Sequence, residues 1–225
     1  MWAILEGVCM NRERFVDLWR RVVDSDYEEA EAIFNRLYSY YDSIERHYHS
    51  AEHITFCLAQ FDKVKAELDD PDAVELALWF HDVIYECGAQ DNELQSSEYF
   101  SECSCKRLSE LYNGKVRQLI MDTTHKAPPK THDGRFIVDI DLSSIALPWP
   151  EFLRDTMNVR AESPLCDNEY YQRQIAFFTA LLKRPRFFYT DYFEKCYGKQ
   201  AKQNLERFIL EVKHGRLNSQ EQAAP

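Results

Sequence analysis

Apolar and aromatic residues recur along the chain with the spacing of amphipathic helices. One set occupies positions 15, 18, 19, 22 and 23, and a second occupies 30, 33, 34, 37, 38 and 41, so each set falls on one helical face. Asn11 is suited to cap the first helix, and Asp70 followed by Pro71 is suited to start the helix of AVELALWF. The pattern predicts these helices and others over about 50–68, 91–111, 113–124, 149–160, 167–183 and 190–213.

One further segment, residues 136–147 (FIVDIDLSSIAL), has the composition of a strand. Its apolar and polar residues alternate poorly, so we expect a helix there as well. Glycine is scarce, at 6 residues in 225, whereas sheet-rich folds use glycine in turns and bulges. The predicted fold class is all-α: one domain over residues 1–214, a bundle of about eight to ten helices, followed by a frayed polar tail at 215–225.

The charge of the chain narrows the choice of partners. Its formal net charge is −11 and its pI is about 5.1. A nucleic-acid backbone or an anionic membrane needs a positively charged face, so we expect neither as the main partner. A small phosphorylated ligand needs only a local cluster of cations and is compatible with this charge.

The cysteines and the apolar runs indicate the compartment. No run reaches the roughly 18 to 20 apolar residues that a membrane helix needs. The first ten residues, MWAILEGVCM, lack a basic leader and a small-residue cleavage site, which argues against a signal peptide. The seven cysteines are odd in number and include no CxxC pair, as is typical of reduced thiols. We therefore expect a cytoplasmic protein.

Histidines and carboxylates next to apolar runs carry the chemical signal. His49 and His53 are four residues apart, so on a helix they would share a face and aim two nitrogens at one point. His81 and Asp82 directly follow ALWF, and burying an unpaired carboxylate costs several kcal/mol. Adjacent helical side chains point about 100° apart, so this pair converges only on a centre that lies between the two directions, as a metal ion can. The competing interpretation is structural: partly buried histidines, with an exposed Asp82.

A second pair of carboxylates, Asp139 and Asp141, lies within the apolar frame VDIDL. A cation would again account for them, although a partly exposed helix face explains one of the two equally well. Mixed histidine and carboxylate ligands suit a divalent ion, with Mn, Mg, Fe, Co, Ni and Zn all open.

These segments, taken in order, resemble a known family. RHYHSAEHI, WFHDVIYE, DNELQSSE, DTTHK and VDIDLSSIAL are similar to segments of the bacterial predicted metal-dependent phosphohydrolases of the HD superfamily, and the resemblance covers about residues 30–210. A lone HD dipeptide carries little information, whereas HxxxH, then WFHD, then DxDL about 57 residues later is specific. The resemblance implies an all-helical HD-type bundle with His53, His81, Asp82 and Asp141 as metal ligands, Asp139 being the alternative to Asp141.

The resemblance also suggests roles around the metal. YHSAEH is similar to the YHNxxHA signature of cyclic-nucleotide phosphodiesterases, in which the first histidine protonates the leaving oxygen, so His49 is the implied general acid. Ser50 replaces the Asn of that signature, which weakens this assignment. His125 matches a family histidine that contacts phosphate or a second metal. The alternative is a histidine at a helix terminus that interacts only with the helix dipole. Glu93 matches an acidic residue that orients or deprotonates water.

Two further cations complete the predicted site. Arg46 lies one turn before His49 and could clamp a phosphate, although a surface salt bridge is an equal alternative. Lys126, next to His125, could offset charge on the phosphoryl oxygens. The implied reaction is hydrolysis of a phosphoester or phosphoanhydride, in a nucleotide or related small molecule, by a water that the metal acidifies and Asp82 or Glu93 orients.

Three alternatives stay open at this point. The site could retain metal and nucleotide without catalysis, as a regulatory module. It could hold two irons and act as an oxygenase, for which His125 is the clear spare ligand. The histidines could also be structural, with no metal at all. A homodimer is compatible with every one of these readings.

Overall fold

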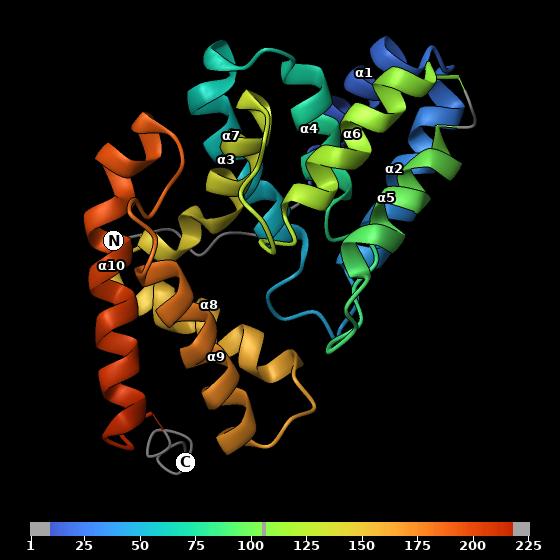
Figure 1. Ribbon diagram of the computed structural model, residues 1–225. Helices are drawn as coiled ribbons and strands as arrows, with labels where there is room; N and C mark the ends of the chain where they lie inside the picture. Colours follow the sequence, from blue (N-terminus) through green and yellow to red (C-terminus); the bar gives the residue numbers. More distant parts are fainter. Residues whose placement is uncertain (1–9, 105–106, 218–225) are drawn as a thin grey trace, which may run out of the picture. The chain divides into compact units, whose positions relative to one another are not determined.

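The computed structural model of the protein describes residues 10–104 and 107–217, which form helices joined by turns and loops (Figure 1). These residues contain ten α-helices, two short 3-10 helices and no strand. The all-α prediction is therefore confirmed, and the ten helices fall within the predicted range. The ambiguous segment 136–147 is helical up to Ala146, as expected, although its helix begins earlier than predicted, at His132. Residues 1–9, which include most of the apolar start, and 218–225, which include most of the predicted tail, lie outside the described residues.

Contacts divide the chain into two compact units, one ending at Asp141 and the other beginning at Leu142. The helices of the first unit are α1 (Arg12–Val23), α2 (Tyr27–Tyr41), α3 (Ala51–Val64), η1 (Lys65–Glu67), α4 (Pro71–Phe80), α5 (Asn92–Cys103), α6 (Glu110–Asp122) and α7 (His132–Leu142). Those of the second are η2 (Ser143–Ala146), α8 (Trp149–Glu162), α9 (Asp167–Leu182) and α10 (Asp191–Lys213). The prediction that one domain spans residues 1–214 stays a prediction.

Side-chain caps set the starts of several helices. The Asn11 carboxamide oxygen accepts from the Arg14 amide at 3.0 Å, and the Asp70 carboxylate accepts from the Ala73 amide at 3.1 Å, with Pro71 in the first turn. Both predicted starts are confirmed. Each cap satisfies an amide that has no partner inside its helix, and replacing such a cap by alanine typically costs about 1 kcal/mol.

Helix α4 forms the centre of the first unit. Every residue from Ala73 to Phe80 is buried, and α4 contacts α1, α3, α5 and α6. In Figure 1, α6 runs alongside α4 and α5. A helix that is apolar on all sides belongs in a core, and aromatic rings from α1, α4 and α5 pack around one another here, among them Phe15, Trp19, Phe80 and Phe100. The carboxyl end of α4 therefore delivers whatever follows Phe80 directly into the interior of the unit.

The second unit is built on α10, which packs against η2 and α9. The buried Asn204 amide of α10 donates to the carbonyls of Ile145 and Leu147, at 2.7 and 2.8 Å. Gly215 ends the helix region with φ at +70°, a conformation that glycine adopts without steric cost. Leu217, two residues into the predicted tail, is buried.

Two other predicted helix bounds are also wrong. The helix expected over 91–111 ends at Cys103, because the buried Ser104 hydroxyl donates to the Ser101 carbonyl and accepts from the Asn113 amide, both at 3.1 Å, and the chain turns there. The helix expected from 113 begins earlier, at Glu110, where Ser109 caps it. Among the helices of the described residues, none has the length together with the apolar character needed to cross a bilayer.

Candidate metal centre

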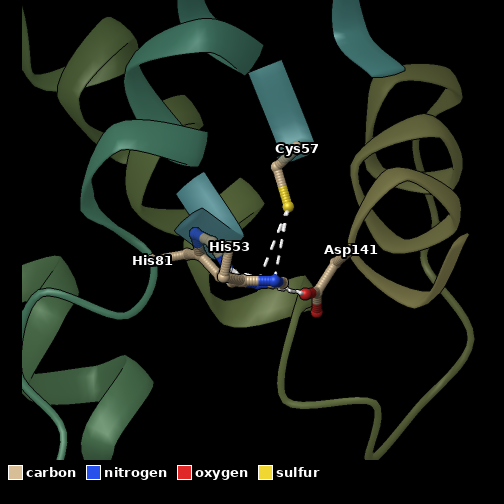
Figure 2. Close-up of side chains that lie close together, drawn as sticks. All are labelled: His53, Cys57, His81 and Asp141. Atoms are coloured by element: carbon tan, nitrogen blue, oxygen red, sulfur yellow. Dashed lines mark hydrogen bonds and ion pairs between the residues drawn. The ribbon is translucent and has the colours of Figure 1, made fainter. Parts of the chain in front are cut away.

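Four of the predicted ligands converge inside the first unit. His53 comes from α3, His81 and Asp82 from the turn that ends α4, and Asp141 from the last turn of α7. His53 Nε2 lies 3.3 Å from His81 Nε2, 3.1 Å from Asp141 Oδ1 and 3.5 Å from Asp82 Oδ2. His81 Nε2 lies 3.1 Å from Asp82 Oδ2 and 3.6 Å from Asp141 Oδ1. Figure 2 shows His53, His81 and Asp141 pointing toward one another.

These separations have the size of a metal coordination sphere. Nitrogen and oxygen ligands lie about 2.0–2.2 Å from a transition metal, so neighbouring donors are about 2.9 Å apart in an octahedron and about 3.5 Å apart in a tetrahedron. The five separations run from 3.1 to 3.6 Å. The donor atoms of these five pairs are therefore spaced as neighbouring ligands of one ion are.

The tautomer of His81 fits a metal ligand. Its Nδ1 lies 2.9 Å from the Leu78 carbonyl oxygen, which can only accept, so Nδ1 carries the proton. In the neutral ring, the lone pair of Nε2 then faces His53 and the two carboxylates. Fixing the tautomer through the second ring nitrogen is how proteins commonly orient a metal-binding imidazole. Two imidazole nitrogens at 3.3 Å repel each other when both present lone pairs, and a proton or a cation between them removes that repulsion.

The charges of the cluster call for a compensating cation. Burial alone would lower the pKa of His81, but the charges of Asp82 and Asp141 and hydrogen bonds to them raise it well above its usual range. Burial would likewise raise the pKa of Asp82 and of Asp141, yet the neighbouring histidines lower both. The two carboxylates therefore stay ionised and hold positive charge beside them. A divalent ion supplies that charge and leaves the imidazoles neutral.

Three side chains fix the turn that carries His81 and Asp82. The Arg46 guanidinium donates to the carbonyls of Asp82 and Val83, both at 2.8 Å, and to that of His49 at 3.2 Å. The Tyr41 hydroxyl donates to the Trp79 carbonyl at 3.0 Å. The Tyr41 bond satisfies a carbonyl in the last turn of α4, and the Arg46 bonds satisfy carbonyls of the turns beside the centre.

The Ser96 hydroxyl holds the other side of this turn, accepting from the Ile84 amide at 3.1 Å and donating to its carbonyl at 3.2 Å. The sequence did not predict that Arg46 fixes this turn, because Arg46 was expected to contact a phosphate or to form a surface salt bridge. Arg46 contacts three backbone carbonyls instead of a carboxylate, so the salt-bridge alternative is wrong. Its predicted phosphate contact stays a prediction.

The prediction that His49 and His53 share a helix face is wrong. Helix α3 begins at Ala51 with Ser50 as its cap residue, so His49 lies in the preceding turn. Its ring nevertheless stays beside the centre, with centroids 6.3 Å from His53 and 3.9 Å from Tyr85, on which it stacks. His49 is partly exposed, and such a position lets an imidazole exchange protons with solvent.

The remaining predicted residues lie at different distances from the centre. His125 Nε2 is 2.9 Å from Asp141 Oδ2, and His125 adopts the left-handed conformation, with φ at +55°. Asp139 is fully buried but lies outside the cluster, because side chains two residues apart on a helix point about 200° apart. Lys126 is exposed and donates to the Gln90 carbonyl at 2.8 Å. Glu93 lies in the first turn of α5, and no hydrogen bond or ion pair of the described residues joins it to the cluster.

One residue of the cluster, Cys57, was missed by sequence reasoning. Its side chain is buried one turn after His53 on α3, and its Sγ lies 3.6 Å from His53 Nε2. The available signal was the i, i+4 spacing from His53. Burial raises the pKa of the Cys57 thiol well above its usual range, and Asp141 and Asp82 raise it further, so the thiol keeps its proton unless a cation is nearby.

A second group with ligand-type atoms, Asp69, His132 and Asp133, lies mostly at the surface. The Asp133 carboxylate accepts from the amides of Asp69 and Asp70, at 2.8 and 2.9 Å, and so holds the chain that leads into α4. This bonding accounts for Asp133, and we assign the group no further role.

Comparisons of the chain with protein-family models, with curated proteins and with solved structures found no match.

Proposed function

We propose that this protein is a metal-dependent phosphohydrolase, acting on a phosphoester or phosphoanhydride of a small molecule such as a nucleotide. The observation that carries the proposal is the meeting of His53 and His81 with Asp82 and Asp141, from three separate segments. The histidine Nε2 atoms lie 3.3 Å from each other and 3.1 to 3.6 Å from the carboxylate oxygens. The ordered motifs that resemble the HD-superfamily phosphohydrolases support the reaction class.

The donor set fits a divalent transition metal. Two imidazole nitrogens with two carboxylate oxygens suit Mn, Fe, Co, Ni and Zn, whereas Mg favours an all-oxygen shell. When bound, such an ion supplies Lewis acidity toward a phosphoryl oxygen and lowers the pKa of a coordinated water. Asp82 is 15% exposed at its side chain, so solvent reaches the side of the cluster that it lines.

Residues around the centre supply the other chemical functions. His49, which is partly exposed and stacked on Tyr85, would hold a proton for the leaving oxygen. The Asp82 carboxylate can orient a nucleophilic water through a hydrogen bond. His125, bonded to the outer oxygen of Asp141, orients that ligand and adds a polar group at the same edge.

The proposed roles of Lys126 and Glu93 rest on the resemblance more than on contacts in the structure. Lys126 would need to release the Gln90 carbonyl before its ammonium could contact a phosphate. No hydrogen bond or ion pair of the described residues joins Glu93 to the cluster, so its role toward the water rests on the resemblance alone. We therefore place the reaction on the cluster and on His49, and treat these two residues as secondary.

A substrate screen tests the proposal. The purified protein, loaded in turn with Mn, Co, Ni, Zn, Fe and Mg, is offered nucleotides, phosphomonoesters and phosphodiesters, and released phosphate or nucleoside is measured. We expect turnover with at least one metal, lost in His53→Gln and retained in His132→Gln, which alters the exposed group instead. Tight nucleotide binding without turnover would point to a binding module, and oxygen uptake with two irons per chain to an oxygenase; either result contradicts the proposal.

A further inference from the structure

We propose that Cys57 is an additional donor of this centre and makes it prefer a thiophilic cation, such as Zn²⁺ or Co²⁺, over Mg²⁺. The inference rests on the proposed metal centre, and it concerns which ion that centre selects.

The position of the thiol supports coordination. Cys57 follows His53 by one turn of α3, so both side chains leave the helix on the same side, as Figure 2 shows. One ligand atom each from His53, Cys57, His81 and Asp141 lies within 4.8 Å of every other. Cys57 is fully buried, so its thiol does not contact solvent.

The closest separation has the length expected for two ligands of one ion. Zinc binds sulfur at about 2.3 Å and nitrogen at about 2.0–2.1 Å, which places sulfur and nitrogen about 3.5 Å apart at a tetrahedral angle. Cys57 Sγ lies 3.6 Å from His53 Nε2. Sγ lies 3.9 Å from the other ring nitrogen of His53 and within 4.8 Å of a ligand atom of His81 and of Asp141. Binding of one ion by all four residues therefore requires their side chains to draw closer together.

The chemistry of sulfur turns this position into selectivity. Coordination replaces the S–H bond with a sulfur–metal bond and releases the proton to solvent, with no change of oxidation state. A thiolate favours Zn²⁺, Co²⁺ and Fe²⁺, whereas Mg²⁺ takes oxygen ligands and waters. A centre with this sulfur therefore gains affinity for the first group and gains none for Mg²⁺.

The alternative is that the thiol only fills space, as buried cysteines commonly do. Cys103 offers a matched control, because it is also buried but lies at the end of α5, outside the cluster. Removing either thiol leaves a similar small change in volume. Only the removal of Cys57 should change the coordination of the ion.

X-ray absorption on the full-length protein loaded with one equivalent of Zn²⁺ provides the test. In the wild type and in Cys103→Ser, we expect one sulfur at about 2.3 Å together with the outer-shell signals of two imidazoles. In Cys57→Ser, we expect only nitrogen and oxygen at about 2.0–2.1 Å. Competition titrations should show the preference for Zn²⁺ over Mg²⁺ falling at least tenfold in Cys57→Ser and in Cys57→Ala, and unchanged in Cys103→Ser.

Three results would overturn the inference, and one of them would also contradict the proposed metal centre. A shell of nitrogen and oxygen alone in the zinc-loaded wild type, with the two imidazoles present, removes Cys57 and leaves the metal centre intact. Sulfur that persists in folded Cys57→Ser also removes it. Failure of the wild type to retain zinc removes the proposed centre itself. Circular dichroism checks the fold of each variant, and the wild-type spectrum decides the question if both Cys57 variants fail to fold.

Discussion

Replacing Arg46 by glutamine should weaken both the fold and the metal centre, although Arg46 contacts no ion. Its guanidinium donates to the carbonyls of His49, Asp82 and Val83 at 2.8 to 3.2 Å, and it lies 5.4 Å from the centre of the Tyr41 ring. Glutamine is too short, and too poor in donors, to replace this fork.

The magnitude follows from these contacts. A hydrogen bond from a charged group contributes about 1.5–3 kcal/mol, and three at the low end sum to about 4.5 kcal/mol. Arg46 is partly exposed, so water replaces some of the lost bonds, and we expect the free energy of unfolding to fall by about 2–4 kcal/mol. Because the clamp fixes the turn that carries a ligand, Asp82, we expect metal affinity to fall about 10- to 100-fold, as for other outer partners of metal ligands.

Urea unfolding in the presence of a chelator measures the first quantity, and calorimetric titration with Zn²⁺ or Mn²⁺ measures the second. Arg12→Gln is the control, because Arg12 makes an exposed ion pair with Glu31 and its loss should cost at most about 1 kcal/mol. Arg46→Lys keeps the charge without the fork and should fall between the wild type and Arg46→Gln. Loss of stability with unchanged metal affinity would refute the positioning role, and a stability change no larger than the control's would refute the clamp.

Three other predictions concern the surroundings of the centre. Asp82 and Asp141 outweigh burial and raise the pKa of His81 well above 6.5, so the metal-free fold gains stability from protonated His81 below pH 6.5 and loses that stability as pH rises through the raised pKa. Metal binding at pH 7 should therefore release a proton and become tighter with rising pH. Calorimetry that shows no proton release in buffers of different ionisation enthalpy would contradict this prediction. His125→Asn, which tolerates the left-handed backbone, should lower metal affinity about tenfold by freeing Asp141 Oδ2, and unchanged affinity would show that Asp141 is oriented without it. Gly134→Ala in α7 should lower the free energy of unfolding by about 1–3 kcal/mol, because the alanine Cβ would meet oxygens of Asp122 and Thr131 and would lie 3.2 Å from Pro129 Cβ. Urea unfolding measures this change. A gain in stability, as expected for alanine at an open helical site, would contradict the prediction.

Local chemistry explains which parts of the fold were predictable. Asn11 and Asp70 cap their own helices, so the starts of α1 and α4 could be read from a few neighbouring residues. The end of α5 could not, because it depends on Ser104 accepting from Asn113, a residue of the next helix. The start of α3 at Ala51 similarly placed His49 outside the helix that spacing alone had assigned to it.

The candidate site shows the same division. The adjacent pair His81 and Asp82 stood out because polar residues ended an apolar run. The structure brings both to His53, and His81 to Asp141. Arg46 and Cys57 carried no such contrast. An arginine in a polar loop and a cysteine in an apolar helix are ordinary by composition. The carbonyls that Arg46 contacts become apparent only in the fold, and the contact of Cys57 with His53 was signalled only by their i, i+4 spacing.

The most direct test of the account is the number of metal ions that the chain binds and which residues that binding requires. Elemental analysis and calorimetric titration of the metal-depleted protein should give one tightly bound divalent ion per chain in the wild type and in His132→Gln. In His53→Gln and Asp141→Asn, affinity should fall by more than about 100-fold, beyond the usual loss for an outer partner. A wild type that binds no divalent ion, or variants at these two positions that bind it as tightly as the wild type, would contradict the central claim.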